Sequence, residues 1–111
     1  MILVLQLIAC ACQPPEDGDM PEGDYANPEA AEVLRVKMDA RMDLVLGCTV
    51  WQSTNAVGIR DGAFSATMVT EDGEFEAELV GTLCDDEINA TFDGRDLLLI
   101  LDEDFSMWSG C

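Results

Sequence analysis

The chain has 111 residues, of which 23 are acidic and five are basic, and its formal net charge is −18. A chain of this length forms one domain at most, and so negative a charge disfavours binding to nucleic acid. Histidine is absent, which excludes Ser–His–Asp and Cys–His catalysis and histidine-based zinc sites, so we expect no catalytic residue, no metal and no cofactor.

The first nine residues form an apolar segment. Its sequence is MILVLQLIA, in which Gln6 is the polar exception, and Cys10 follows it. Such a segment is typical of an export signal, and the alternative is a buried N-terminal strand. Nine residues are too few to span a bilayer, which takes about 20 residues as a helix.

The four residues Leu7-Ile8-Ala9-Cys10 resemble the lipobox of bacterial lipoproteins. The resemblance implies that residues 1–9 are a signal peptide and that Cys10 becomes the lipidated first residue of the mature chain. It also implies export to the periplasm and a lipid anchor in the bacterial envelope, with the outer membrane favoured. It ends at Cys10 and implies nothing about the domain that follows.

Residues 13–30 predict a tether. They contain all four prolines of the chain, many acids and no basic residue. Proline lacks a backbone N–H, and an acidic stretch cannot bury enough apolar surface to fold. We therefore divide the chain into a signal peptide (1–9), a lipid-anchored acidic tether (10–30) and a small antiparallel β domain (31–111).

The segment 33–51 alternates between apolar and charged residues. Apolar side chains occupy every second position from Leu34 to Leu46, and charged side chains fill most of the gaps. A helix would scatter these charges around its axis, whereas a strand places them on one face. At ~3.3 Å per residue one strand of this length is too long for the domain, so we expect a bend or break near Asp39–Arg41.

Turn signals divide the rest of the chain. Asp61-Gly62, Asp72-Gly73 and Asp93-Gly94 suit type I′ hairpins, which need positive φ at both central residues. Asp85-Asp86 marks a weaker turn.

The segments between these turns alternate with period 2, as half-buried strands do. In the stretch 74–83, Phe75 and Gly81 fall on the inward face. The continuous apolar run Leu97–Leu101 predicts a strand that is covered on both faces or lies at a seam. The predicted strands after residue 55 are 56–60, 63–70, 74–83, 87–92, 96–102 and 105–109.

These segments predict an all-β fold. Seven or eight antiparallel strands in a domain this small form a meander that closes into a barrel or flattened barrel, with a two-sheet sandwich as the alternative.

Four cysteines remain once Cys10 is lipidated, which predicts two disulfides in an oxidising compartment. Alternating strand directions place Cys84 at one end of the barrel, and Cys48 and Cys111 at the other. Bridged Cα atoms lie within ~7 Å of each other. The favoured pairing is therefore Cys48–Cys111 with Cys12–Cys84.

Glu74, Glu76 and Glu78 form a candidate acidic binding strip, because residues two apart in a strand share a face. Such a strip attracts basic proteins, although a solvated face that only keeps the domain soluble is the alternative. We expect a non-catalytic binding or structural module. Other possibilities are an inhibitor or docking module for a basic cell-envelope enzyme, a carboxylate-dependent hydrolase and a small-molecule carrier.

Overall fold

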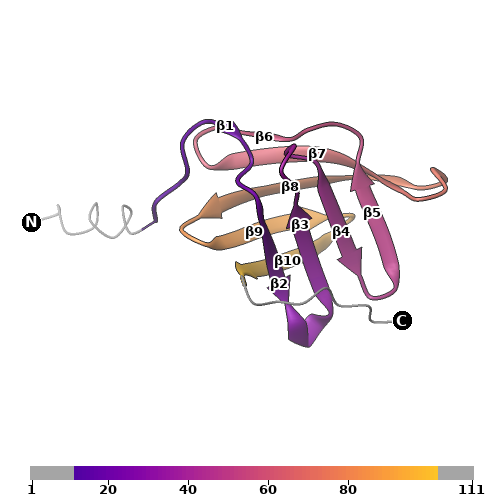
Figure 1. Cartoon of the computed structure of the whole chain (residues 1–111). Coiled ribbons are helices and arrows are strands. Elements are labelled where there is room, and N and C mark those ends of the chain that lie inside the picture. Colours follow the sequence, from indigo (N-terminus) through magenta and orange to yellow (C-terminus); the bar gives the residue numbers. More distant parts are fainter. Residues whose placement is uncertain (1–11, 103–111) are drawn as a thin grey trace, which may run out of the picture.

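Eight antiparallel strands close into a barrel in the computed structural model, which describes residues 12–102 (Figure 1). Each strand pairs with the next along the chain, and β10 pairs with β2 to complete the circle. The closed meander expected from the sequence is confirmed. The barrel strands are β2 (Gly23–Asn27), β3 (Glu32–Val36), β4 (Met42–Leu46), β5 (Thr49–Ser53), β7 (Ala63–Thr70), β8 (Glu76–Cys84), β9 (Glu87–Phe92) and β10 (Arg95–Leu101).

A two-stranded ribbon caps one end of the barrel. It consists of β1 (Gly18–Asp19) and β6 (Gly58–Ile59). Met20 N donates to Val57 O at 3.0 Å, and both side chains are buried in the main core. The strand predicted over 56–60 therefore belongs to this cap instead of the barrel wall.

The prediction that residues 13–30 hold no regular structure is wrong. Strand β2 lies in this stretch and pairs with β10 on one side and β3 on the other. Tyr25 is only 3% exposed. The flanking prolines do not interrupt the hydrogen bonds of β2, since Pro21 precedes the strand and Pro28 begins the short 3-10 helix η1 (Pro28–Ala30). The folded domain thus begins well before residue 31.

The long alternating segment breaks where the sequence predicted a break, between β3 and β4. Ala40 adopts a left-handed φ of 67°, and Lys37 N donates to Arg41 O at 2.8 Å. A second break was not predicted. It occurs at Gly47, whose φ of 62° is easily adopted by glycine and allows β4 and β5 to form a hairpin.

Two of the three Asp-Gly dipeptides form the expected tight turns. Asp61 and Gly62 have φ values of 53° and 79°, and Asp93 and Gly94 have values of 51° and 80°. Positive φ at both positions is the requirement of a type I′ hairpin.

The third dipeptide behaves differently. Only Gly73 has a positive φ, and the connection between β7 and β8 is longer, since β7 ends at Thr70 and β8 begins at Glu76. The strand predicted over 74–83 is therefore two residues too long at its start. Phe75, which was predicted to face inward, is 62% exposed.

Alternate side chains of the strands fill the barrel interior. At one end Trp51 packs edge-to-face on Phe92, with ring centroids 4.9 Å apart. Leu97–Leu101 was expected to be covered on both faces or to lie at a seam. Coverage on both faces is wrong, because Leu98 is 46% exposed. The seam is confirmed, because β10 pairs with β2 where the barrel closes. The predicted strand 105–109 lies outside the described residues. The largest fully buried side chains are Phe92, Leu34, Met42, Leu44, Met68, Leu79, Ile88, Leu99 and Val36.

Gly81 faces the interior, as predicted, at a point where β8 and β9 approach closely. A Cβ atom at this position would lie 2.7 Å from Ala90 Cβ and 2.8 Å from Asn89 O. The second contact is with backbone, which cannot move aside without disturbing the ladder between the two strands.

We therefore expect Gly81→Ala to lower the free energy of unfolding by about 1–3 kcal/mol, the usual effect of overpacking. Urea denaturation measures this. Thr82→Ala, on the exposed face of the same strand, is the control and should change stability by no more than about 0.5 kcal/mol. Equal effects of the two substitutions would show that Gly81 is not tightly enclosed.

Candidate functional site

Basic residues are absent from three adjacent strands on one side of the barrel. The sequence from residue 61 to residue 94, which forms β7, β8 and β9, contains no lysine or arginine. The same stretch contains the acids Asp61, Glu71, Asp72, Glu74, Glu76, Glu78, Asp85, Asp86, Glu87 and Asp93.

Basic residues elsewhere are largely neutralised by nearby carboxylates. Four of them form ion pairs, and each acidic partner also lies outside residues 61–94. The pairs are Arg35–Asp24 at 2.8 Å, Lys37–Asp43 at 3.5 Å, Arg41–Asp39 at 3.8 Å and Arg95–Glu32 at 2.7 Å. Residues 61–94, which form β7, β8, β9 and their turns, therefore carry ten of the 18 net negative charges of the chain.

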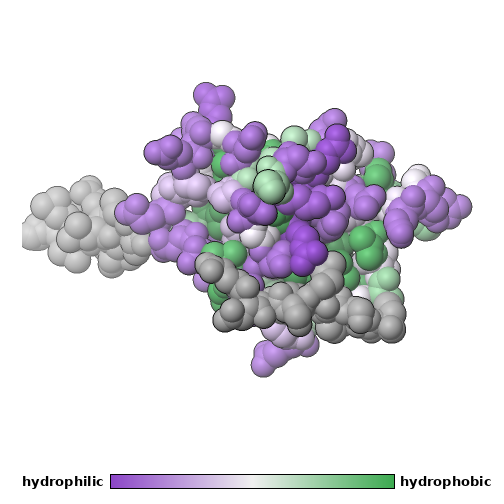
Figure 2. Space-filling model, viewed as in Figure 1, coloured by the Kyte–Doolittle hydropathy of each residue, from purple (hydrophilic) through white to green (hydrophobic). Residues whose placement is uncertain are grey.

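The β7–β8 hairpin extends beyond its neighbours in the barrel wall (Figure 1). Pairing between β8 and β9 ends at Leu79↔Phe92, so the first residues of β8 pair with β7 alone. All the residues from 71 to 76 are exposed. Figure 2 shows hydrophilic residues over most of the visible face, including this projecting hairpin.

The turn of this hairpin is fixed by the side chain of Asp72. Its Oδ1 accepts hydrogen bonds from Glu74 N at 3.0 Å and from Thr70 Oγ1 at 2.7 Å. Thr70 Oγ1 in turn accepts from Phe75 N at 3.2 Å. The bond from Glu74 N, and next that from Thr70, holds the pKa of Asp72 below its ordinary value, because both donors favour the charged form.

Phe75 is the exposed aromatic residue of this turn. It lies between Glu74 and Glu76, and it lines a shallow hollow together with Glu71 and residues of the β4–β5 turn. Of the five large apolar side chains that are exposed among the described residues, Phe75 is the one aromatic residue, and aromatic residues are enriched at protein–protein interfaces relative to the rest of the surface. We name Glu71, Asp72, Glu74, Phe75 and Glu76 the acidic tip.

The predicted acidic strip is divided between this turn and β8. Glu74 belongs to the turn, whereas Glu76 and Glu78 lie on the outer face of β8. Thr67 Oγ1 donates to Glu78 Oε2 at 2.6 Å. The sequence placed Glu76 and Glu78 correctly on the outer face of a strand, but it wrongly placed Glu74 on that strand and missed the exposure of Phe75. The signal for both was the turn-forming Asp72-Gly73, which precedes them.

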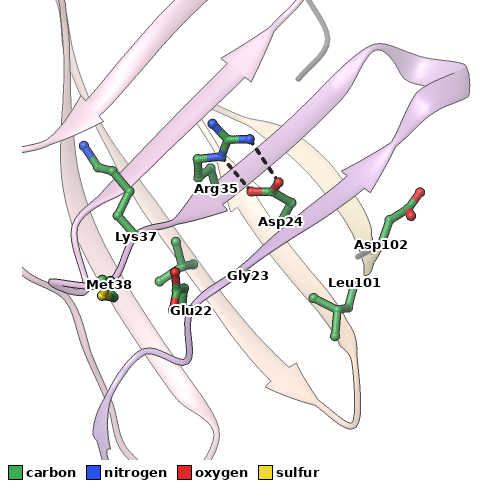
Figure 3. A pocket seen from close by; sticks show the side chains of 9 residues that line it. Glu22, Gly23, Asp24, Arg35, Lys37, Met38, Leu101 and Asp102 are labelled. Atoms are coloured by element: carbon green, nitrogen blue, oxygen red, sulfur yellow. Dashed lines mark hydrogen bonds and ion pairs between the residues drawn. The ribbon is translucent and has the colours of Figure 1, made fainter. Parts of the chain in front are cut away.

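A second hollow lies on the outer face of β2 and β3 (Figure 3). Arg35 lies on its wall and donates to both carboxylate oxygens of Asp24, at 2.8 Å and 3.0 Å. This hydrogen bonding raises the pKa of Arg35. Lys37, which also lines the hollow, pairs with Asp43. The cationic groups of the hollow are therefore already matched to carboxylates, which leaves little to attract an anionic ligand.

The other carboxylate clusters lie at separate ends of the barrel. Asp85, Asp86 and Glu87 are exposed beside the turn that follows β8, whereas Glu71 and Asp72 precede this strand. The nine residues of β8 separate the two groups by about 30 Å at 3.3 Å per residue. Within residues 12–102, no group of three or more Cys, Asp or Glu is arranged to hold a metal ion.

The disulfide predicted between Cys12 and Cys84 is confirmed, with Cα atoms 5.3 Å apart. Next to it, Asp85 N donates to Gln13 O at 2.9 Å, so the start of the described chain is held against this end of the barrel. Cys48 lies in the β4–β5 turn at the opposite end. The expected partner of Cys48, Cys111, and the predicted lipidation site, Cys10, lie outside the described residues.

No protein-family model, curated protein or solved structure matches the chain. Within the part of the chain that the structure describes, no helix is long and apolar enough to cross a membrane. The function must therefore be argued from the surface of the barrel itself.

The pKa of Asp72 predicts how the acidic tip responds to acid. Since this pKa is depressed in the folded chain from an ordinary value of 3.8, the stabilising effect of the carboxylate is present above pH 3.8. It is lost as the pH falls through the lower folded pKa. We expect the amide resonance of Glu74, followed by NMR during acid titration, to shift with a midpoint below pH 3.8.

The control for this titration is Thr70→Val, which removes one of the two donors and should move the midpoint towards 3.8. A midpoint at or above 3.8 in the unmodified chain would show that these hydrogen bonds do not hold the turn in solution.

Proposed function

We propose that the chain is an exported, lipid-anchored envelope protein whose barrel binds a basic protein through the acidic tip. The observation that carries this proposal is the exposed Phe75 among exposed carboxylates on a projecting hairpin. The proposal gives the barrel a binding role without catalysis.

The carboxylates and the aromatic ring would have separate roles in this interaction. The uncompensated carboxylates of β7, β8 and β9 raise the local concentration of a cationic protein and accelerate its encounter with the barrel. Phe75 then supplies the apolar contact, since a buried aromatic anchor surrounded by polar residues is the usual energetic centre of an interface.

The position of Cys12 supports an orientation for the anchored protein. Cys12 is bonded to the barrel, and Cys10 precedes it by two residues. A lipidated Cys10 would therefore hold this end of the barrel within about 7 Å of the membrane surface. The acidic tip lies at the far end of β8, about 30 Å away at 3.3 Å per residue, where a partner could reach it.

An inhibitor or docking module for a basic cell-envelope enzyme is the more specific form of this proposal. A projecting hairpin with one aromatic residue suits insertion into a cleft of such an enzyme. The competing functions have less support. The barrel interior is filled with side chains, which disfavours a carrier, and the two carboxylate clusters lie at opposite ends of β8, which disfavours a hydrolase.

The anchor predicts a mature chain that begins with an acylated Cys10. Mass spectrometry of the membrane fraction of a producing bacterium should show loss of residues 1–9 and the added mass of acyl chains. Cys10→Ser should leave the protein unacylated and out of the membrane fraction. A soluble protein that retains Met1 would contradict the anchor without affecting the acidic tip.

The acidic tip predicts salt-sensitive binding to a cationic protein. With a basic lysozyme as the probe, Glu74→Lys/Glu76→Lys should weaken binding about tenfold at low salt, since removing complementary charge slows encounter. The difference should vanish near 1 M salt, where the Debye length is about 3 Å. Phe75→Ala should also weaken binding, and its effect should persist at high salt.

Matched control variants distinguish binding at the acidic tip from a general attraction that depends only on net charge. Glu29→Lys/Asp96→Lys changes the net charge by the same amount as Glu74→Lys/Glu76→Lys, at exposed sites outside residues 61–94. Val80→Ala removes another exposed apolar side chain. Both controls should bind as the unmodified chain does. Equal weakening by the two double variants in titration calorimetry would show that the attraction is general and that the tip is not a binding site.

A further inference from the structure

A second apolar cluster lies on the outside of the barrel wall. It consists of Ala26, Val33 and Val45, with Val50 packed against them. Neighbours along the chain such as Leu34 belong to the interior core, so these four side chains point outward, because successive residues of a strand alternate. Ladder pairs join Ala26 to Val33, Val33 to Val45 and Val45 to Val50. We name these four side chains the outer row.

Three side chains of the outer row are buried and Val50 is partly buried, although the row faces away from the core. Val33 is 2% exposed, whereas Val80, which points outward from β8, is 50% exposed. Among the described elements, β3 packs against β2, β4, β10 and η1. These elements belong to the barrel wall or to the β2–β3 connection. The burial of the row therefore calls for a segment that crosses the outer surface of the wall.

A buried oxygen beside the outer row supports the same conclusion. In the strand register Asp24 pairs with Arg35, and Arg35 pairs with Asp43. These three residues therefore form a second row beside the outer row, on the same face of the wall. The Oδ1 of Asp43 is buried and accepts no hydrogen bond from the described residues, although Lys37 Nζ lies 3.5 Å away. The ion pair with Lys37 is long, and a buried acceptor that lacks a hydrogen bond is costly, so a covering segment that brings an N–H or O–H group would satisfy it.

We infer that the C-terminal segment 103–111 of the same chain covers the outer row. Asp102 N donates to Asp24 O at 2.9 Å, so the segment starts at the edge of this face. Nine extended residues reach about 30 Å. The distance from β2 to β5, three strand spacings of about 4.8 Å, is only about 15 Å.

The composition of the segment fits the surface. Phe105, Met107 and Trp108 are large apolar side chains that suit a row of one alanine and three valines, and Cys111 follows them. The row ends on β5, and Cys48 lies in the turn that precedes this strand. A bond between Cys48 and Cys111 would pin the covering segment across β2, β3, β4 and β5, which lie side by side in the wall (Figure 1).

The test uses the full chain with Trp51→Phe, in which Trp108 is the one remaining tryptophan. Its emission should be blue-shifted, and acrylamide should quench it several-fold less than it quenches a free tryptophan derivative. Adding Val33→Asp should shift the emission to the red and raise the quenching several-fold. Val80→Asp, the matched outward valine on β8, should leave both unchanged.

Two further measurements decide the result if Val33→Asp fails to fold. A non-reducing peptide map of the Trp51→Phe chain should contain the Cys48–Cys111 bond, and sedimentation should show a monomer. Free quenching of Trp108 in the folded chain, or a different partner for Cys48, would overturn the inference. Shielding of Trp108 that appears only on dimerisation would assign the outer row to a second copy instead.

Discussion

Closure of the barrel by the pairing of β10 with β2 is the constraint on which the rest of the structure depends. Ile100 pairs with Ala26 and Leu101 with Tyr25, which joins the end of the folded chain to its beginning. Without this pairing both strands would present unpaired edges. Closure leaves each strand with one face towards a filled interior and one face outside, and it turns an apparently unstructured N-terminal stretch into part of the wall.

Closure also places the base-free strands and the strands with paired charges on different sides of the barrel. Around β2, β3 and β4, carboxylates and basic side chains neutralise one another, as in the paired hydrogen bonds of Arg35 to Asp24. On β7, β8 and β9 there is no base to do so. A net charge spread evenly would mainly give solubility, whereas this arrangement gives the barrel an acidic side that ends in a projecting hairpin with an exposed aromatic ring.

The sequence predicted correctly the strands that have clear period-2 patterns. It failed at short elements whose neighbouring residues favour a loop. The alternation of β8 and β9 and the break at Ala40 follow from residue spacing, which is a local property. The bond between Cys12 and Cys84, which are 72 residues apart, follows from the alternating strand directions, which place Cys48 and Cys84 at opposite ends of the barrel. Strand β2 was missed because five residues among prolines and acids carry little signal. Phe75 was assigned inward because its turn contains more residues than a two-residue hairpin, which shifts the start of β8.

By itself the sequence determined the fold class, the antiparallel meander and the stretch from residue 61 to residue 94 that carries acids but no base, because periodicity, turn residues and charge are read directly from neighbouring positions. The tertiary structure alone decided which strands close the barrel, that Phe75 stands in water and that Ala26, Val33 and Val45 form a buried row on the outer surface. These features depend on register between strands distant in the chain, and register is set by packing and hydrogen bonding around the whole wall.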